Sequence, residues 1–314
     1  MDFSIQFDTY LAPGTPLVAG FGVFDGVHPG HRLIVRKVVE MAERCGALPA
    51  AVTFVPHPRA VIPGGTAPEA IISVPERIAQ LRLAGARAVG IIDFTPEFGA
   101  MAPEAFLEAL LHFKEFKLAG ICVGEDWRFG KMGKGDACIL SRFARDNGFG
   151  FQSVERLTRG GCNISSSVIR ELAAKGDLEG AAKILGRPLT LSGTVVQGFR
   201  IAGSQLNAPT ANLRLDHGLL VPDGVYAGAA VTEKGPFAAV LNIGMAPTYD
   251  VNERRIEVHL LNFEGSLYDK PLTVKLFKYL RPERKFPSPA ELREQIGKDI
   301  AQADFIYHSI TQEV

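Results

Sequence analysis

The feature that most constrains the fold is a change in the hydrophobic pattern near residues 186–188, Gly-Arg-Pro. Before this point, short apolar runs alternate with segments of helical period, which is typical of a parallel sheet covered by helices. After it, short runs rich in Val, Leu and Thr are broken by Gly and Pro, which is typical of a β-barrel. The chain of 314 residues also exceeds the usual size of one domain. We therefore predict two domains, at residues 1–186 and 187–314.

The first domain is expected to bind its ligands at the carboxyl ends of parallel strands. The expected strands are 17–24, 50–55, 88–93, 118–123 and 149–154, and the expected helices are 32–44, 75–84, 103–113, 165–174 and 178–185. In the second domain the expected strands are 193–197, 224–232, 237–243, 256–261 and 272–279, followed by an amphipathic helix at 288–306.

Residues 22–31, Gly-Val-Phe-Asp-Gly-Val-His-Pro-Gly-His, join the first expected strand to the first expected helix. Glycines allow the backbone to approach an anion, and a helix start offers unpaired N–H groups. His28 and His31 can donate to phosphate oxygens as charge builds in a transition state. The segment therefore indicates phosphoryl or nucleotidyl transfer. Two histidines three residues apart also occur as metal ligands or capping residues, and this alternative stays open.

Three further segments of the first domain carry polar groups at the ends of expected elements. His57 lies in a Pro-His-Pro-Arg segment after the second strand, where a proline-stiffened turn is the alternative. Residues 124–130, Gly-Glu-Asp-Trp-Arg-Phe-Gly, suit a flat polar ring, with core packing plus a surface ion pair as the alternative. Residues 165–167 are three serines about one turn before Arg170, a pattern that suits either phosphate binding or a plain N-cap.

Two segments of the second domain are ambiguous by themselves. Residues 209–212, Pro-Thr-Ala-Asn, are typical of a proline-initiated turn in which Asn bonds its own backbone. Glu257, in the strand Ile-Glu-Val-His-Leu-Leu at 256–261, is read alone as an outward-facing strand residue.

Taken in order, these segments resemble the bacterial bifunctional riboflavin kinase/FAD synthetase family over nearly the whole chain. The motifs that match are HxGH at 28–31, PHP at 56–58, GxDFRFG at 124–130, ISSTxIR at 164–170 and PTAN at 209–212. The resemblance implies a Rossmann-like α/β nucleotidyltransferase domain with FMN adenylyltransferase activity at 1–186. It implies a small β-barrel riboflavin kinase domain with a C-terminal helix at 187–314. Such an enzyme phosphorylates riboflavin to FMN with ATP and adenylylates FMN to FAD with release of pyrophosphate.

The same resemblance implies roles for single residues. His28 and His31 would contact the ATP phosphates and stabilise the adenylyl transition state, while Arg170 would neutralise phosphate. Glu257 would be the general base of the kinase, and Thr210 and Asn212 would hold the Mg²⁺ of bound ATP, an ion that prefers oxygen ligands. ATP or phosphate contacts are implied for Gly22, Phe24, Asp25, Gly26, Gly30, His57, Ser165, Ser166, Ser167, Gly203 and Thr210. Flavin contacts are implied for Asp126, Trp127, Arg128 and Phe129. Residues 242–248 and 281–286 match segments that flank the active site.

The chain departs from the family pattern at several positions. Trp127 replaces the usual Phe and Ser167 the usual Thr. Before the PTAN motif, Asn207 replaces a glycine and Ala208 an aromatic residue, so this loop has fewer glycines and cations to wrap ATP phosphates. We therefore expect weaker ATP affinity at the kinase site than in a relative with the usual loop. Two alternatives are an FAD synthetase with a weakened or inactive kinase module and a flavin-binding or regulatory protein without catalysis.

Charge and cysteine content exclude other classes. The 34 basic residues balance 34 acidic ones, which indicates no nucleic-acid or membrane partner. No apolar run reaches the roughly 20 residues of a membrane span, and the start of the chain lacks the pattern of a signal peptide. The four cysteines have no CxxC spacing, so neither a zinc site nor a disulfide framework is predicted. We expect a cytoplasmic monomer or weak homo-oligomer whose partners are riboflavin, FMN and ATP.

Overall fold

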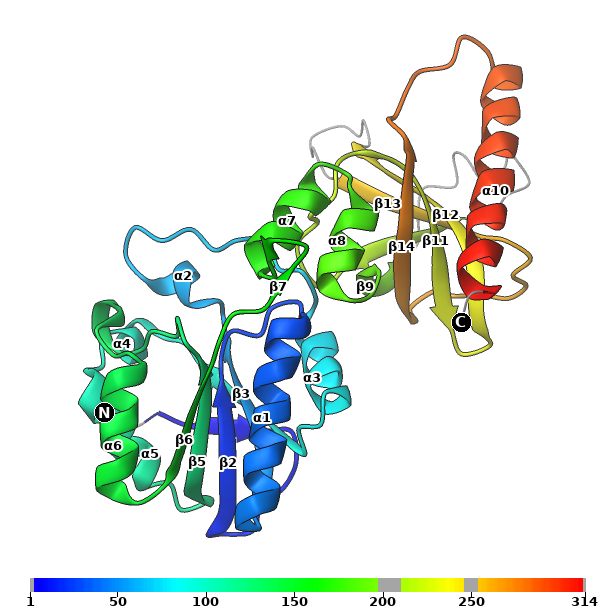
Figure 1. Cartoon of the computed structure of the whole chain (residues 1–314). Helices are drawn as coiled ribbons and strands as arrows, with labels where there is room; N and C mark the ends of the chain where they lie inside the picture. The colour runs from blue at the N-terminus through cyan, green and yellow to red at the C-terminus, as the bar shows by residue number, and fades with distance from the viewer. Residues whose placement is uncertain (1–2, 197–209, 246–253, 313–314) are drawn as a thin grey trace. The chain divides into compact units, whose positions relative to one another are not determined.

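The computed structural model describes residues 3–196, 210–245 and 254–312, which divide into two compact units (Figure 1). Unit 1 consists of the described residues of Met1–Pro68 and Val74–Ser165, and unit 2 of those of Glu69–Ser73 and Ser166–Val314. The domain boundary expected between residues 186 and 187 stays a prediction. The compact units themselves divide after Ser165, because the two helices that follow it pack with unit 2.

Unit 1 is a six-stranded sheet with helices on both faces, which confirms the predicted α/β class. Its sheet strands are β1 (Ile5–Phe7), β2 (Thr15–Phe21), β3 (Leu48–Val55), β4 (Ala88–Asp93), β5 (Phe116–Gly124) and β6 (Gly150–Val154). Its helices are α1 (Pro29–Cys45), α2 (Pro58–Val61), α3 (Val74–Leu83), α4 (Pro96–Gly99), α5 (Pro103–Leu111), the 3₁₀ turn η1 (Lys131–Gly133) and α6 (Ala137–Asn147). A short hairpin, β7 (Thr158–Arg159) and β8 (Cys162–Asn163), follows β6.

The strand order is β1-β4-β3-β2-β5-β6, and all pairs are parallel except β1 with β4. The chain continues from β2 through β3 to β4 on one side of β2, and then crosses over to β5 and β6 on the other side. This is the topological switch point at which open α/β sheets bind ligands, and the loops after β2 and β5 both border it.

Small residues let α1 lie close against the sheet, on the face opposite α5 and α6 (Figure 1). A Cβ on Gly20 would come within 2.9 Å of Val38, and one on Gly120 would collide with Met41. On the opposite face, a core of interlocking aromatic and aliphatic side chains packs between the sheet and α5 and α6; it includes Phe21, Phe106, Leu110, Leu140 and Phe129. Close packing on both faces holds the strand ends rigidly, and with them the loops that carry the candidate site.

Seven elements of unit 1 were not predicted, namely the edge strand β1, the short helices α2 and α4, the turn η1, the helix α6 and the hairpin strands β7 and β8. The edge strand β1 spans three residues, too few for a period to be read. The helix α6 was missed although its signals are present: Asp136 accepts hydrogen bonds from the N–H groups of Cys138 and Ile139 at 3.0 Å, and Gly148 ends the helix at φ 72°. The buried residues of α6 are Leu140 and Ala144, and two positions are too few for a helical period to be recognised in the sequence.

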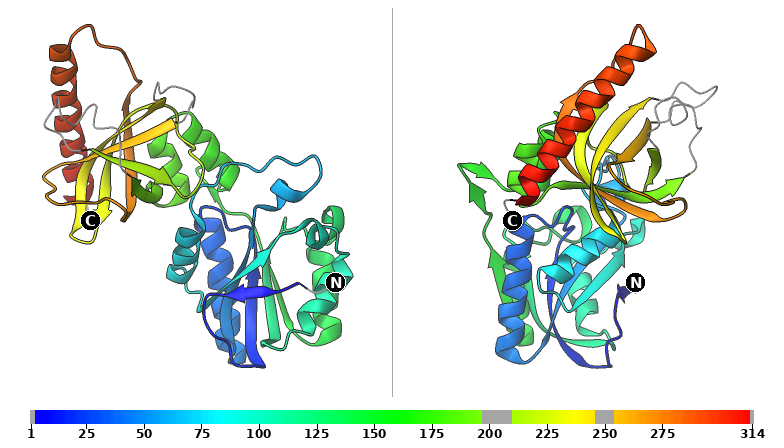
Figure 2. Two further views of the ribbon diagram at one scale, coloured as in Figure 1. Left: turned by 180° about the vertical axis from the view of Figure 1, so that it is seen from behind. Right: turned by 90° about the vertical axis from the view of Figure 1, so that its right-hand side faces the viewer.

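Unit 2 is a closed six-stranded antiparallel barrel with a C-terminal helix, which confirms the predicted barrel class, and its described residues also include the two helices that were expected in the first domain. Its elements are α7 (Ser166–Ala174), α8 (Leu178–Leu185), β9 (Leu189–Val196), β10 (Thr210–Leu215), β11 (Gly224–Thr232), β12 (Gly235–Met245), β13 (Arg254–Leu260), β14 (Pro271–Arg281) and α10 (Pro289–Gln312). The barrel order is β10-β13-β12-β11-β14-β9, and α10 runs along its outside against β11, β12 and β14 (Figure 2).

Strand β10 corrects one interpretation of the sequence. Thr210 and Asn212 belong to a paired strand rather than to a turn, because β10 pairs with β9 on one side and β13 on the other.

None of the helices in the described part of the chain combines the length and the apolar composition that a membrane span requires.

Candidate active sites

The turn after β2 has an unusual backbone. Phe24 and Val27 have positive φ angles of 52° and 42°, and Gly26 between them has φ 83°. Both apolar side chains are fully buried, so packing holds a conformation that costs about 1–3 kcal/mol per residue. Backbone strain of this kind persists where surrounding structure over-determines it. The expected strand 17–24 therefore ends early, at Phe21, and residues 22–28 form the turn.

The two histidines of this turn lie face to face at the start of α1. Their ring centroids are 3.6 Å apart at an interplanar angle of 17°, and the edge of Phe24 meets His31 at 5.3 Å. His28 Nδ1 accepts a hydrogen bond from the His31 N–H at 3.3 Å, so His28 caps the helix, one of the alternatives left open by the sequence. A Cβ on Gly30 would lie 3.2 Å from the His28 ring, so the absence of a side chain there leaves room for this stack.

A buried arginine to which the sequence analysis gave no role supports this turn, through its hydrogen bonds to residues of β3. Arg77, in α3, donates to Thr53 Oγ1 at 3.2 Å and to the Phe54 carbonyl at 3.3 Å. Thr53 Oγ1 in turn donates to the Val23 carbonyl at 2.8 Å. Arg32 Nε donates to the Val27 carbonyl at 3.2 Å from the other side. These contacts fix the carbonyl groups of the turn and so the direction of its N–H groups.

A cavity of about 310 Å³ opens at the carboxyl ends of β2 to β5. Its lining is mostly apolar, with several aromatic rings and a few cationic groups, and includes Phe54, His57, Arg59, Phe98, Trp127 and Phe129. Trp127 and Phe129 stack at 4.8 Å and 18°. His57 also caps α2 by accepting from the Arg59 N–H at 3.1 Å. The size and the stacked rings suit a flat aromatic ligand.

The charged residues of the 124–130 segment are placed differently from its aromatics. Arg128 lines the cavity but is exposed and paired with Asp136 at 3.1 Å. Asp126 is outside the lining and pairs with Arg156 at 2.7 Å. The alternative of core packing plus surface ion pairs thus describes part of this segment, while Trp127 and Phe129 contribute to a ligand-sized space.

The serine run opens α7 as expected. Ser165 is the last residue of unit 1, and α7 begins at Ser166 in unit 2. Arg170, one turn into α7, donates from Nε to the Glu69 carbonyl at 2.7 Å. The segment 69–73 is therefore tied to the helix that carries the candidate phosphate ligands.

The second site is built on three neighbouring barrel strands. Glu257 on β13 lies in register with Asn212 on β10 and with Asn242 on β12. Two residues along, His259 lies in register with Thr210. Opposed residues of antiparallel strands share a face of the sheet, with Cβ atoms about 4.5–5.5 Å apart. The structure therefore brings Thr210 and Asn212 beside Glu257, which lies on another strand far from them in the sequence.

These polar side chains face outward from the barrel, because the alternate residues Ile256 and Val258 are buried inside it. They are partly buried, and of these residues Asn212 is the one outside the lining of the cavity beside Glu257. Thr210, Asn242 and Glu257 line a cavity of about 910 Å³ whose other wall is residues 281–289 and α10. Glu257 is half-buried, and this burial, together with the charge of Glu283, raises the pKa of its carboxyl, while Arg255 acts in the opposite direction. A carboxylate with raised proton affinity beside a ligand-sized cavity is a candidate general base.

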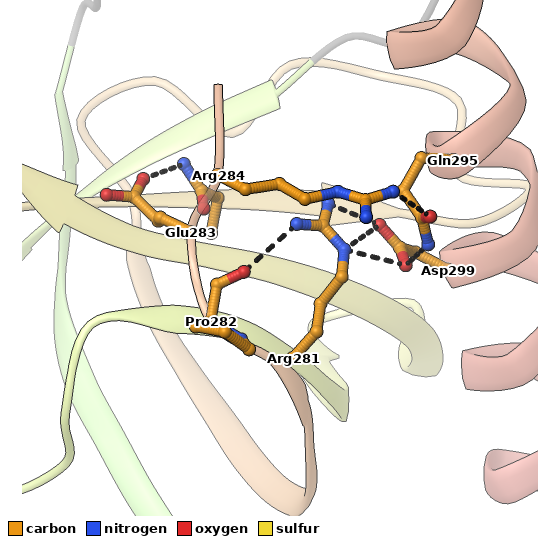
Figure 3. Close-up of polar contacts among 7 residues, drawn as sticks. Arg281, Pro282, Glu283, Arg284, Gln295 and Asp299 are labelled. Carbon is orange, nitrogen blue, oxygen red and sulfur yellow. Dashed lines mark hydrogen bonds and ion pairs between the residues drawn. The ribbon is translucent and has the colours of Figure 1, made fainter. Parts of the chain in front are cut away.

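The wall opposite Glu257 is held by a network that sequence reasoning missed (Figure 3). Arg281 binds Asp299 on α10, with the shortest contact at 2.7 Å, and Arg284 donates to Gln295 at 2.7 Å. Asn242 donates to Glu283 at 3.1 Å. The sequence signal was present only as the family-like segment 281–286. The predicted phosphate contact Gly203, with Asn207 and Ala208, lies outside the described residues.

Comparison with known proteins shows two matching families along the chain. A family described as FAD synthetase matches residues 13–168, and one described as riboflavin kinase matches residues 185–307. The bifunctional riboflavin kinase/FMN adenylyltransferase of Escherichia coli strain K12 is 32% identical over 289 residues, covering 92% of each chain. That of Bacillus subtilis strain 168 is 34% identical over 293 residues, covering 91% of each. The crystal structure of a macrolide-efflux protein from Streptococcus pneumoniae superimposes with a TM-score of 0.81 at 27% identity, covering 92% of this chain and 94% of that one. The chain belongs to the family of bifunctional riboflavin kinase/FMN adenylyltransferases.

Proposed function

We propose that the chain phosphorylates riboflavin to FMN in the cavity beside Glu257 and adenylylates FMN to FAD at the turn between β2 and α1. The observation that carries the proposal is the presence of a separate built site on each family-matched module. One is a strained helix-start turn with stacked histidines, and the other is a large cavity with a half-buried carboxylate.

Adenylyl transfer at the first site needs no protein nucleophile. An oxygen of the FMN phosphate attacks the α-phosphorus of ATP, and the bond to the bridging oxygen breaks as pyrophosphate leaves in line. Charge builds on the phosphate oxygens, where His28 and His31 would donate and where the N-terminus of α1 favours negative charge. The N–H groups of residues 22–30 would supply further phosphate contacts within unit 1, and the phosphate-binding roles of Ser165, Ser166, Ser167 and Arg170 stay predictions.

The flavin ring of FMN would occupy the aromatic cavity of unit 1. Stacking on Trp127 and Phe129 explains why the space is lined by rings and stays largely apolar. Arg128 and His57 would supply the polar contacts at its edge. Asp126 would contribute only by leaving its ion pair with Arg156.

At the second site Glu257 would take the proton of the 5′-hydroxyl of riboflavin. That oxygen attacks the γ-phosphorus of ATP, and ADP leaves. A raised pKa suits this role because a general base is most effective when its pKa approaches the working pH.

The residues present also fit the magnesium ion of bound ATP. Thr210 and Asn212 are two residues apart on β10, so their side-chain oxygens share one face beside Glu257. Hard oxygen ligands on few protein groups, completed by phosphate, are what Mg²⁺ prefers. When bound there, the ion would neutralise charge on the transferred phosphate.

A second candidate is an FAD synthetase with a weakened kinase module. It is favoured by Asn207 and Ala208 in the sequence of the loop before β10. A cytoplasmic location and a monomeric or weakly associating state stay predictions as well.

One time course separates the two candidates. The purified protein is incubated with riboflavin, ATP and Mg²⁺, and in parallel with FMN, and the flavins are resolved by chromatography. FMN followed by FAD from riboflavin supports the bifunctional enzyme. FAD formed only from added FMN supports the second candidate, and no flavin product in either reaction overturns both.

A further inference from the structure

Asn242 is the polar neighbour of Glu257 to which the sequence assigned no role of its own. It lies in register with Glu257 across β12 and β13, and its side chain lines the same 910 Å³ cavity. A substrate hydroxyl that approaches Glu257 therefore comes within reach of the Asn242 carboxamide. The question is which end of this carboxamide faces the substrate.

Glu283 answers it. The Asn242 Nδ2 group donates to Glu283 Oε1 at 3.1 Å. An ionised carboxylate only accepts hydrogen bonds, so it selects the rotamer of Asn242 that turns the NH₂ group toward Glu283. The carbonyl oxygen of Asn242 is then directed away from Glu283 as an acceptor, which is what a hydroxyl donor needs.

The position of Glu283 is itself fixed on both sides along the chain (Figure 3). Arg281, two residues before it, binds Asp299, and Arg284, immediately after it, donates to Gln295. Both partners belong to α10. The Glu283 carboxylate lies over Gly244 of β12, where a Cβ would collide with it. The lack of a side chain at residue 244 thus makes room for the carboxylate.

We infer that Glu283 is a positioning residue of the kinase reaction: it holds Asn242 so that the carboxamide oxygen accepts a hydrogen bond from the polyhydroxyl side chain of the flavin next to Glu257. This inference rests on the proposed kinase function of the cavity. It assigns Asn242 to substrate binding and Glu283 to the orientation of Asn242.

The test compares steady-state kinetics of FMN formation in the full-length chain. Glu283→Ala and Asn242→Ala are each expected to raise KM for riboflavin about tenfold, which corresponds to one lost hydrogen bond, with KM for ATP changed less than about twofold. Because Glu283 acts through Asn242, the double variant should be no worse than Asn242→Ala alone. Gly244→Ala, which displaces the carboxylate, should resemble Glu283→Ala. Glu294→Ala, an exposed carboxylate of α10 outside the cavity, is the matched control.

Glu283→Gln separates orientation from charge, because its amide oxygen can still accept from Asn242. KM for riboflavin in Glu283→Gln should stay within about twofold of that of the unsubstituted enzyme. Additive effects of the two alanine substitutions, or a KM in Glu283→Gln as high as in Glu283→Ala, would overturn the inference. Far-ultraviolet circular dichroism, which reports both units, is recorded for every variant as the control for folding. Absence of FMN formation in the unsubstituted enzyme would instead overturn the proposed kinase function and, with it, this inference.

Discussion

The guanidinium of Arg281 donates three hydrogen bonds to the carboxylate of Asp299, from Nε to both oxygens at 3.1 Å and from Nη2 to Oδ2 at 2.7 Å. Only 18% of the Arg281 side chain and 5% of the Asp299 side chain are exposed. The pair joins the end of β14 to the middle of α10, so it fixes the wall of the cavity that faces Glu257.

Loss of one partner should destabilise unit 2. Asp299→Ala leaves a poorly solvated guanidinium unpaired, which typically costs about 3 kcal/mol of unfolding free energy. The exposed pair of Glu294 with Lys298 is the control, because solvent screens this pair and Glu294→Ala should leave the urea midpoint of unfolding nearly unchanged.

The single tryptophan allows the loss to be located. Trp127 lies in unit 1, so its fluorescence in a urea titration reports that unit, while far-ultraviolet circular dichroism reports both. We expect Asp299→Ala to shift the dichroism transition to lower urea and to leave the fluorescence transition in place. Equal shifts in both signals would contradict a local role.

Glu257→Gln should stop the kinase reaction alone. The amide keeps the size of the side chain but cannot take the proton of the 5′-hydroxyl, so FMN formation should fall by about 10²- to 10⁴-fold. Rates of FMN formation from riboflavin and of FAD formation from FMN are measured side by side, with the exposed Glu264→Gln as control. A residual rate within tenfold of the unsubstituted enzyme would rule out Glu257 as the base.

The kinase reaction should also show an acid limb set by Glu257. Burial raises the pKa of this carboxyl, and only its ionised form can accept a proton, so kcat should rise with pH through that raised pKa. The midpoint should lie above the ordinary glutamate value of about 4.3. The pH dependence of kcat with saturating riboflavin and ATP measures it, and a midpoint at or below the ordinary value would argue against this assignment.

An aromatic ring at position 127 should be enough for flavin binding, whether it belongs to Trp or to Phe. Trp127→Phe keeps an aromatic face beside Phe129 and should change KM for FMN in the adenylylation reaction by less than about threefold. Trp127→Ala removes the stack, which is worth about 1–3 kcal/mol for a planar base, and should raise KM about tenfold or more. Equal values for the two variants would place the flavin elsewhere.

His31→Ala tests the adenylylation site with little disturbance of the helix. The backbone N–H that donates to His28 Nδ1 remains, so only the imidazole is lost. We expect FAD formation to fall by at least about 10²-fold, as for other lost transition-state donors, while FMN formation continues. A parallel loss of FMN formation would show that the variant acts through folding.

Local pattern was sufficient for most elements because a strand or helix with one buried face repeats its apolar residues at a fixed period. Strand β4 and helix α8 were placed with their observed bounds. Strand β10 was missed because Thr210 and Asn212 were interpreted as a motif rather than as alternate residues of a strand. The left-handed conformations of Phe24 and Val27 could not be foreseen, since neither residue favours them and only tertiary packing imposes them.

The two sites differ in how much of their arrangement could be predicted from the sequence. His28 and His31 are three residues apart, so a helix start alone places them together. The contact of Asn242 with Glu283 spans 41 residues, and that of Arg281 with Asp299 spans 18. Their meeting depends on barrel closure and on the path of α10, which no local spacing records.

The central claim, two independent sites on one chain, is tested most directly by mixing two variants. His31→Ala and Glu257→Gln are incubated separately and together with riboflavin, ATP and Mg²⁺, and FAD is quantified by chromatography. We expect FAD in the mixture and in neither variant alone, because FMN released by His31→Ala is adenylylated by Glu257→Gln. A mixture that makes no FAD, although each variant keeps its single activity, would contradict it.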